Sequence, residues 1–246
     1  MSILDIFRKK KLPPGDPKTQ KAGQKLINKN TELGTRYEAA RELAKIDSTE
    51  AVYCLLQRFT VVIGGATPDE DEKNNVRKAV VMAGSKSIDA IMKFLRNKET
   101  VGQALDILKE LTTEEEFLDL LLELTESFDP YFSKYPDKKA QTFMEISQFK
   151  DPRIIDALAP YLEDDDDDIR IQAVKALANQ NDEENTRELL VQCLVECDER
   201  PRVRIAACEV LLEKGWTVKG FRKQAENALP DRFYLNKKGA LLERKG

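Results

Sequence analysis

Apolar residues recur every three or four positions along most of the chain, and short polar stretches interrupt them at regular intervals. Residues 37–44 and residues 51–59 each carry such a stripe, and the polar turn Asp47–Glu50 between them has the composition of a helix N-cap. A period of three to four residues is typical of an amphipathic helix with one buried face. The segment therefore predicts a helix, a tight turn and a second helix.

The same helix–turn–helix pattern returns along the chain. The later copies occupy residues 76–95, 104–124, 143–162, 169–194 and 203–229, and the copy at 104–124 is the weakest. No long stretch alternates with the period of two that a half-buried strand requires. One helix pair cannot bury its apolar face alone, whereas stacked pairs bury it against one another. We therefore predict an all-α fold, an α-solenoid of about five to six helix pairs.

An aspartate stands six residues before an arginine in three copies, with a β-branched residue directly before each arginine. The pairs are Asp71 with Arg77, Asp164 with Arg170, and Asp198 with Arg204, and Asn30 before Arg36 is a weakened fourth copy. The arginines recur at intervals of 41 and 34 residues, which is the period of a helical repeat. We interpret the pairs as a structural ladder, in which each guanidinium reaches the Asp of its own or a neighbouring repeat.

The pattern resembles HEAT repeats, in particular the short bacterial, phycobilin-lyase-like (E-Z) type. The resemblance is carried by Asp164–Leu177, which follows the pattern Asp-x-x-x-x-Ile-Arg-x-x-Ala-x-x-Ala-Leu, and by Asp151–Leu158. It covers roughly residues 31–229, although residues 98–137 match poorly. The resemblance implies an armadillo-like scaffold whose concave surface is lined by the helices that begin at Arg36, Arg77, Arg170 and Arg204.

Composition excludes several enzymes that are built from HEAT-like repeats. The chain has no histidine, so it lacks the His-Glu iron ligands of the deoxyhypusine hydroxylase type and any His-based triad. The alkylpurine glycosylase type uses a basic DNA-binding face, whereas this chain has a net charge of −4 and one tryptophan, Trp216. A phycobilin-lyase-like chaperone or lyase, or another ligand-handling HEAT enzyme, stays open as the alternative function.

The charge of the chain is unevenly distributed. Residues 1–30 carry eight basic and two acidic side chains, and residues 216–246 carry eight basic and three acidic ones. Residues 151–200 carry five basic and fifteen acidic side chains. Nucleic-acid binding usually requires a broad basic face, so this pattern favours charge-selected contacts with proteins. We predict a protein partner and no nucleic acid.

The candidate metal ligands have simpler structural interpretations. The cysteines lie on apolar helical stripes, where free Cys packs as a small hydrophobic residue; they are Cys54, Cys193, Cys197 and Cys208. Cys193 and Cys197 are one helical turn apart and would be the only adjacent zinc ligands. The run Asp164–Asp168 lacks the glycine of a calcium loop, so we interpret it as a solvated acidic turn. We predict no metal and no cofactor.

The chain divides by composition into three parts. Residues 1–30 form a basic N-terminal segment, expected to be partly flexible, residues 31–229 the solenoid, and residues 230–246 a C-terminal tail. The amphipathic stretch Ile3–Lys11 favours at most a weak contact with a membrane surface. No apolar run approaches the roughly 18 residues of a membrane span, and no signal peptide is recognised, so we expect a cytoplasmic protein.

Two connections are longer than the others, Thr60–Glu72 and Ser127–Asp137, and both follow the second helix of a pair. Insertions on one edge of a repeat array often mark its binding side. The second connection holds aromatic residues that either bind a partner or fold back over the irregular third pair. The partner-binding candidates are Tyr131, Phe132 and Tyr135 of this loop, Asp164 and Asp166 of the acidic turn, and Phe233 and Tyr234 of the tail.

For Phe233 and Tyr234, covering of the exposed core of the last repeat stays the alternative. We therefore expect a non-enzymatic scaffold or adaptor that binds a protein through its concave face or its loop edge.

Overall fold

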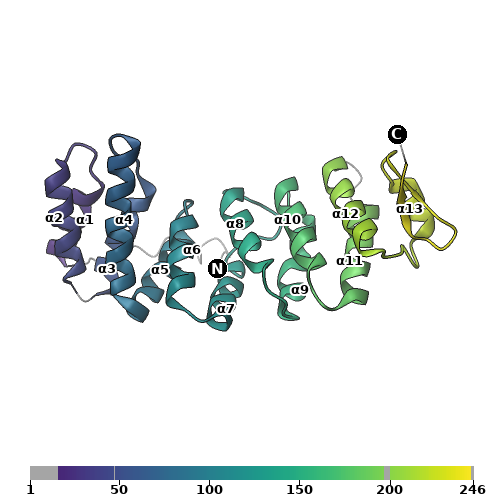
Figure 1. The fold of residues 1–246 in the computed structure, drawn as a ribbon, viewed down its shortest axis with the longest axis horizontal. Coiled ribbons are helices and arrows are strands. Elements are labelled where there is room, and N and C mark those ends of the chain that lie inside the picture. Colours follow the sequence, from purple (N-terminus) through teal and green to yellow (C-terminus); the bar gives the residue numbers. More distant parts are fainter. Residues whose placement is uncertain (1–15, 47, 197–199, 245–246) are drawn as a thin grey trace, which may run out of the picture. The chain divides into compact units, whose positions relative to one another are not determined.

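The computed structural model describes residues 16–46, 48–196 and 200–244, and the chain divides into two compact units. Unit 1 ends at Glu114 and unit 2 begins at Glu115. Each unit is a stack of helices joined by short connections (Figure 1), so the predicted all-α class with stacked helix pairs is confirmed. Within the described ranges, no helix has the length and apolar character needed to cross a bilayer.

Unit 1 arranges its helices in two layers. Helix α4 packs against α2 on one side and α6 on the other, and α3 lies between α1 and α5 in the second layer (Figure 1). The bounds are α1 Pro17–Ile27, α2 Leu33–Ala44, α3 Thr49–Leu56, α4 Ala66–Met82, α5 Ile88–Asn97 and α6 Gly102–Leu111, with short 3-10 helices η2 at Gln57–Thr60 and η3 at Gly84–Ser87.

Helix α1 falls inside the segment that the sequence pattern assigns to a basic N-terminal part. Asp16 caps it by accepting a hydrogen bond from the Thr19 amide at 3.1 Å. Its apolar side packs on α2 and α3 through buried Ala22 and Leu26. Residues 17–27 are therefore an integral helix of unit 1, while residues 1–15 lie outside the described residues.

Unit 2 repeats the two-layer arrangement. Helix α10 packs between α8 and α12, and α11 packs against η4 and α13 (Figure 1). The bounds are α7 Glu114–Thr125, α8 Pro136–Ile146, α9 Arg153–Leu158, α10 Asp167–Ala178, α11 Glu183–Glu196, α12 Pro201–Lys214 and α13 Arg222–Ala228, with the 3-10 helix η4 at Ala159–Glu163. The weakest predicted pair, residues 104–124, is divided between the two units.

The predicted C-terminal tail contains a short antiparallel hairpin of β1 (Phe233–Leu235) and β2 (Leu241–Glu243). The aromatic ring of Phe233 is buried at 2% exposure, so the prediction that Phe233 contacts a partner is wrong. Tyr234 faces the opposite side of the strand and is 41% exposed. Strand β2 packs on α12, and Trp216 is buried after the left-handed Gly215 that ends this helix. The hairpin covers the end of unit 2 in the way that a solenoid cap does.

A buried cluster of charges ties unit 1 together. Arg58 in η2 and Glu72 in α4 are almost completely enclosed, and Arg58 Nε donates to Glu72 Oε1 at 3.0 Å. Arg36 in α2 donates to the same carboxylate at 3.0 Å, and Arg58 also donates to Asp69 at 2.6 Å. The backbone amide of Ile63 completes the set by donating to Asp69 at 2.9 Å. Because enclosed charges require partners, the cluster fixes α2, η2, α4 and the connection before α4.

The charge states in this cluster follow from its geometry. Burial alone raises the pKa of Asp69, but hydrogen bonds from Lys73 and Arg58 outweigh it and hold that pKa well below its usual range. Burial also opposes ionisation of Glu72, and the two arginines nevertheless lower its pKa. Both carboxylates are therefore ionised at neutral pH.

The prediction that Thr60–Glu72 is a long connection is wrong, because α4 begins at Ala66. Asp71 consequently lies inside the helix and is exposed, instead of occupying a turn beside Arg77. Asp69, Glu72 and Val76 are spaced three and four residues apart and form the buried face of α4. The sequence does not mark this face as buried, because two of its residues are acidic. The arginines that neutralise these carboxylates come from other helices.

We expect Glu72→Gln to lower the free energy of unfolding of unit 1 by about 3 kcal/mol, because it leaves enclosed arginines without their shared carboxylate. Urea unfolding followed by circular dichroism measures the change, and hydrogen exchange should rise across residues 57–82. Glu70→Gln, an exposed neighbour on the same helix, is the matched control and should change stability by less than about 0.5 kcal/mol. Equal effects of the two substitutions would contradict the role of the cluster.

Candidate functional site

The connection between α7 and α8 presents three aromatic side chains to solvent. Tyr131 is 60% exposed, Phe132 57% and Tyr135 40%. The backbone of this loop is nevertheless fixed, because the Asp165 amide donates to the Tyr131 carbonyl at 3.1 Å and the Ser133 amide donates to the Asp165 carboxylate at 3.0 Å. The structure thus places the predicted aromatic loop directly on the predicted acidic turn, although the two are about 30 residues apart in sequence.

The side chain of Asp164 contacts this loop from the protein interior. Its carboxylate is completely buried and accepts hydrogen bonds from Ser133 Oγ at 3.0 Å, Lys139 Nζ at 2.5 Å and the Asp166 amide at 3.0 Å. Lys139 in turn donates to the carbonyls of Asp129 and Phe132. The prediction that Asp164 contacts a partner directly is therefore wrong, because an enclosed carboxylate with three donors cannot reach another protein. Asp164 instead orders the loop that carries the aromatic residues.

The other aspartates of the acidic turn have separate structural roles. Asp166 is the N-cap of α10 and accepts from the amides of Asp168 and Ile169. Asp167 pairs with Arg200 at 2.6 Å and Asp168 with Arg202 at 2.5 Å. Among the described residues, no three His, Cys, Asp or Glu side chains are grouped as metal ligands. Asp166 is partly exposed beside the loop and stays a predicted contact residue.

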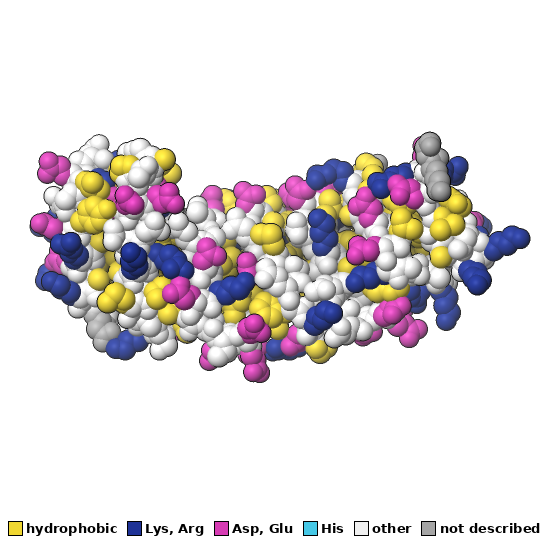
Figure 2. Space-filling model, in the orientation of Figure 1, with side chains coloured by type: hydrophobic (Ala, Val, Ile, Leu, Met, Phe, Trp, Pro, Cys, Tyr) yellow, Lys and Arg dark blue, Asp and Glu magenta, His cyan; other side chains and the backbone are white. Residues whose placement is uncertain are grey.

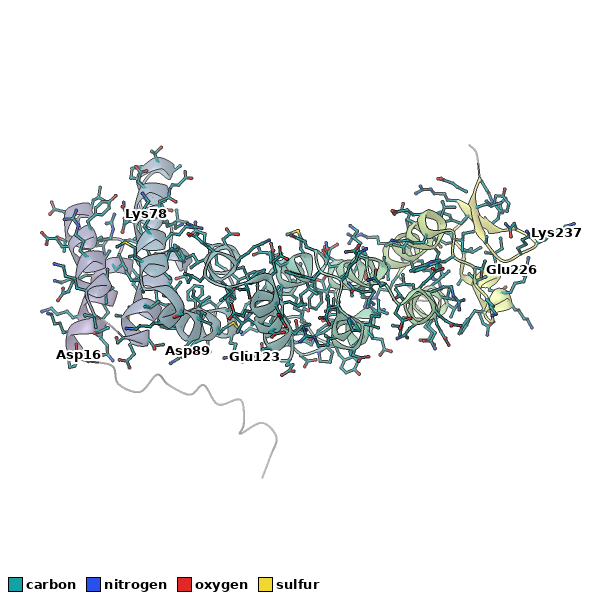
Figure 3. The ribbon with its side chains drawn as sticks, turned by 60° about the horizontal axis from the view of Figure 1, so that its bottom comes forward. Asp16, Lys78, Asp89, Glu123, Glu226 and Lys237 are labelled. Atoms are coloured by element: carbon teal, nitrogen blue, oxygen red, sulfur yellow. The ribbon has the colours of Figure 1, made fainter. Side chains whose placement is uncertain are left out.

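An open hollow of about 650 Å³ lies beside the aromatic loop, between α7 and the α9–η4 segment; we call it the α7–α9 groove. Its largely apolar part is formed by Leu122, Thr125, Phe128, Pro130, Ala157, Pro160 and Tyr161. Its charged lining is formed by Asp119, Glu123, Glu126, Asp156 and Arg153. Figure 2 shows hydrophobic side chains beside acidic ones near the position of α7, and Figure 3 places Glu123 at the surface of the unit.

Polar contacts within unit 2 fix both sides of this groove. Tyr161 donates from its hydroxyl to the Thr125 carbonyl at 2.9 Å, which joins η4 to the end of α7. Burial raises the pKa of the Tyr161 phenol far above its usual value, so the hydroxyl stays a donor. Arg153 bridges Asp119 of α7 at 2.7 Å and Asp151 at 2.9 Å. Contacts within unit 2 thus connect the two sides of the groove.

Lys138 lies behind the groove lining. Its side chain is buried, and its Nζ sits 5.4 Å from the centre of the Phe128 ring. Burial lowers the pKa of Lys138 from 10.5 to about 8. Lys138 therefore loses its proton at a lower pH than an exposed lysine does.

The predicted Asp–Arg ladder takes a different form in the structure. Arg77 pairs with Glu110 of α6 at 2.5 Å and not with Asp71, which is a correction. Arg170 does meet Asp164, but its guanidinium donates to the backbone carbonyls of Asp164 and Glu163 because the carboxylate faces Lys139. Arg204 lies in α12, and its predicted partner Asp198 is outside the described residues.

The predicted contact residues are only partly brought together. The exposed aromatics and Asp166 share one edge of unit 2, whereas Tyr234 belongs to the hairpin that covers the α12 end of the same unit (Figure 1). No sequence pattern indicated the α7–α9 groove. Residues 114–125 and 153–163 carry apolar stripes that predict buried helical faces, and nothing in either stripe shows which apolar positions stay uncovered.

Comparison with protein families matches residues 133–212 to HEAT repeats. The match spans about a third of the chain and lies entirely within unit 2. It begins in the aromatic loop and continues to the end region of α12, so it contains the acidic turn. Comparisons with curated proteins and with solved structures gave no match. The HEAT-repeat prediction is confirmed for this region, and the phycobilin-lyase-like subtype stays a prediction.

We expect Asp164→Asn to lower the unfolding free energy of unit 2 by about 3 kcal/mol, because the buried Lys139 ammonium loses its counter-charge. Hydrogen exchange measured by mass spectrometry should increase most in residues 127–135. Asp168→Asn, which alters an exposed pair of the same turn, should cost less than about 1 kcal/mol. A loop that keeps its protection in Asp164→Asn would show that Asp164 does not order it.

We expect Lys138→Met to stabilise unit 2 at pH 7 by about 2 kcal/mol, and this advantage should shrink towards pH 10. The folded wild type loses the Lys138 proton near pH 8, whereas the unfolded chain keeps it until about pH 10.5. The unfolded state therefore binds more protons in this window, so wild-type stability rises with pH while the variant lacks the rise. Urea unfolding followed by Trp216 fluorescence at both pH values tests this, and a pH-independent difference would contradict it.

Proposed function

We propose that the protein is a non-enzymatic adaptor, and that unit 2 binds a protein partner through the aromatic loop and the adjoining α7–α9 groove. HEAT repeats commonly form scaffolds for protein interactions, and the matched residues 133–212 include the part of this surface that is formed by Tyr135 and the α9–η4 segment. The observation that carries the proposal is the exposure of three neighbouring aromatic side chains on a loop whose backbone is held by buried Asp164 and Lys139.

Exposed aromatic residues on an ordered backbone are suited to binding. Tyr and Phe bury a large area with few rotatable bonds, so they contribute more than most residues to protein interfaces. An ordered loop loses little backbone entropy when a partner arrives. The groove beside it extends the surface with apolar lining and partly exposed Phe128. Together these features support recognition of a protein surface or segment.

A ligand-handling role, including the phycobilin-lyase-like one, is the second candidate. The groove volume of about 650 Å³ falls within the range of small-molecule pockets, and its lining is mainly apolar. The groove is open to solvent on one side, however, and its charged lining is mostly acidic. A chromophore that co-purifies with the protein and absorbs visible light would favour this candidate over the adaptor role.

The adaptor role predicts that Tyr131→Ser/Phe132→Ser loses a partner that the wild type captures. Quantitative mass spectrometry after affinity capture from the native cells should show at least about a tenfold loss of that partner, since interface aromatics often contribute 2 kcal/mol or more. Met82→Ser/Met144→Ser removes two exposed apolar side chains elsewhere and serves as the matched control. Unchanged recovery with the loop variant would contradict the proposal.

A further inference from the structure

The charged lining of the α7–α9 groove has a strong acidic excess. Four carboxylates, those of Asp119, Glu123, Glu126 and Asp156, stand against the single guanidinium of Arg153. Arg153 is already engaged by Asp119 and by Asp151 outside the groove. The groove lining therefore combines apolar side chains with more carboxylates than cations.

This combination defines the chemistry of an occupant. Apolar side chains of an occupant would cover Leu122, Phe128 and Ala157, which are all partly exposed. Lys or Arg side chains next to them would meet the carboxylates, and such charge complementarity sets specificity and the rate of association. The fitting ligand is a short segment with several apolar residues directly followed by several basic ones.

The chain itself contains such a segment at residues 3–11, outside the described residues. Its sequence is Ile-Leu-Asp-Ile-Phe-Arg-Lys-Lys-Lys, in which four large apolar residues precede four consecutive cations. No other stretch of the chain joins four apolar residues to four consecutive basic ones. We propose that the α7–α9 groove binds residues 3–11 of a second copy of this chain, and this inference rests on the proposed binding role of the unit 2 surface.

A direct binding experiment uses a fluorescein-labelled synthetic peptide of residues 1–12 and fluorescence anisotropy. The acceptor is the full-length chain carrying Arg8→Glu, Lys9→Glu, Lys10→Glu and Lys11→Glu, so that its own segment does not compete. We expect saturable binding with a Kd on the order of 10 µM, which is typical of weak, small interfaces. Unlabelled wild-type protein should displace the peptide, and raising the salt from about 50 to 500 mM should weaken binding several-fold.

The groove is tested by introducing Glu123→Lys/Asp156→Lys into the acceptor, which should weaken binding at least about tenfold. Both carboxylates are exposed, and the milder Glu126→Gln provides a second variant in case the double reversal perturbs folding. Glu188→Lys/Glu196→Lys makes the same charge change on α11, away from the groove lining, and should leave binding within about twofold.

Three results would overturn the proposal. They are no saturable binding up to about 200 µM peptide, equal binding of a peptide with Glu at positions 8–11, and binding that the groove variants leave unchanged. If the peptide fails but Tyr131→Ser/Phe132→Ser still loses a captured partner, the occupant is wrong and the adaptor role stands. If the loop variant also has no effect, the proposed binding role of this surface fails as well.

Discussion

Each unit depends on carboxylates that are enclosed and must be neutralised by cations from elsewhere in the chain. In unit 1 these are Asp69 and Glu72, and in unit 2 the corresponding residue is Asp164. An unpaired buried carboxylate would cost several kcal/mol, so the cation partners are as necessary as the apolar core. In both units the cluster also captures the connection after a second helix, through the Ile63 amide in one and Ser133 in the other. Both connections are thereby ordered by buried polar contacts.

Neighbouring helix pairs are joined by polar contacts between residues about one repeat apart. Arg36 reaches Glu72 and Arg77 reaches Glu110 in unit 1, whereas Asn179 donates to the Ser147 carbonyl in unit 2. Some of these contacts are charged and others neutral, yet they share the separation that the repeat period imposes. Apolar stripes give each pair its general affinity for the next one, and these contacts select the register in which the pairs meet.

The helix pairs could be predicted from the sequence because helical periodicity and N-cap residues are local signals. Asp166 illustrates this, since its position before an apolar stripe is enough to predict an N-cap. Asp71 and Arg77 show the limit of such local signals. Their spacing repeats, but the residue of α4 that faces arginines is Glu72, which contacts Arg36 and Arg58. The rotation of α4 about its axis determines which of its residues is buried. The exposed Tyr131 and the buried Phe233 looked equivalent in sequence, because exposure depends on what packs over a side chain.

The small hairpin was missed for a related reason. Three-residue strands are too short to produce a clear alternation, and the polar turn Asn236–Gly239 is also compatible with an irregular tail. The groove was missed because a groove is a property of two helical faces that do not fully cover each other. Both features arise from tertiary packing, which single-sequence patterns describe only indirectly.

Because the enclosed carboxylates of each unit require particular cations, the order of the helix pairs is encoded as well as their affinity. Interchangeable pairs would be free to slip by one position or to exchange with those of another chain. In unit 1, a shift of one helix pair would separate Glu72 from both Arg36 and Arg58, and the buried carboxylate of Glu72 would have no counter-charge. In unit 2, it would do the same to Asp164 and Lys139. These enclosed ion pairs thus favour one order of the helix pairs and destabilise a shifted or exchanged order.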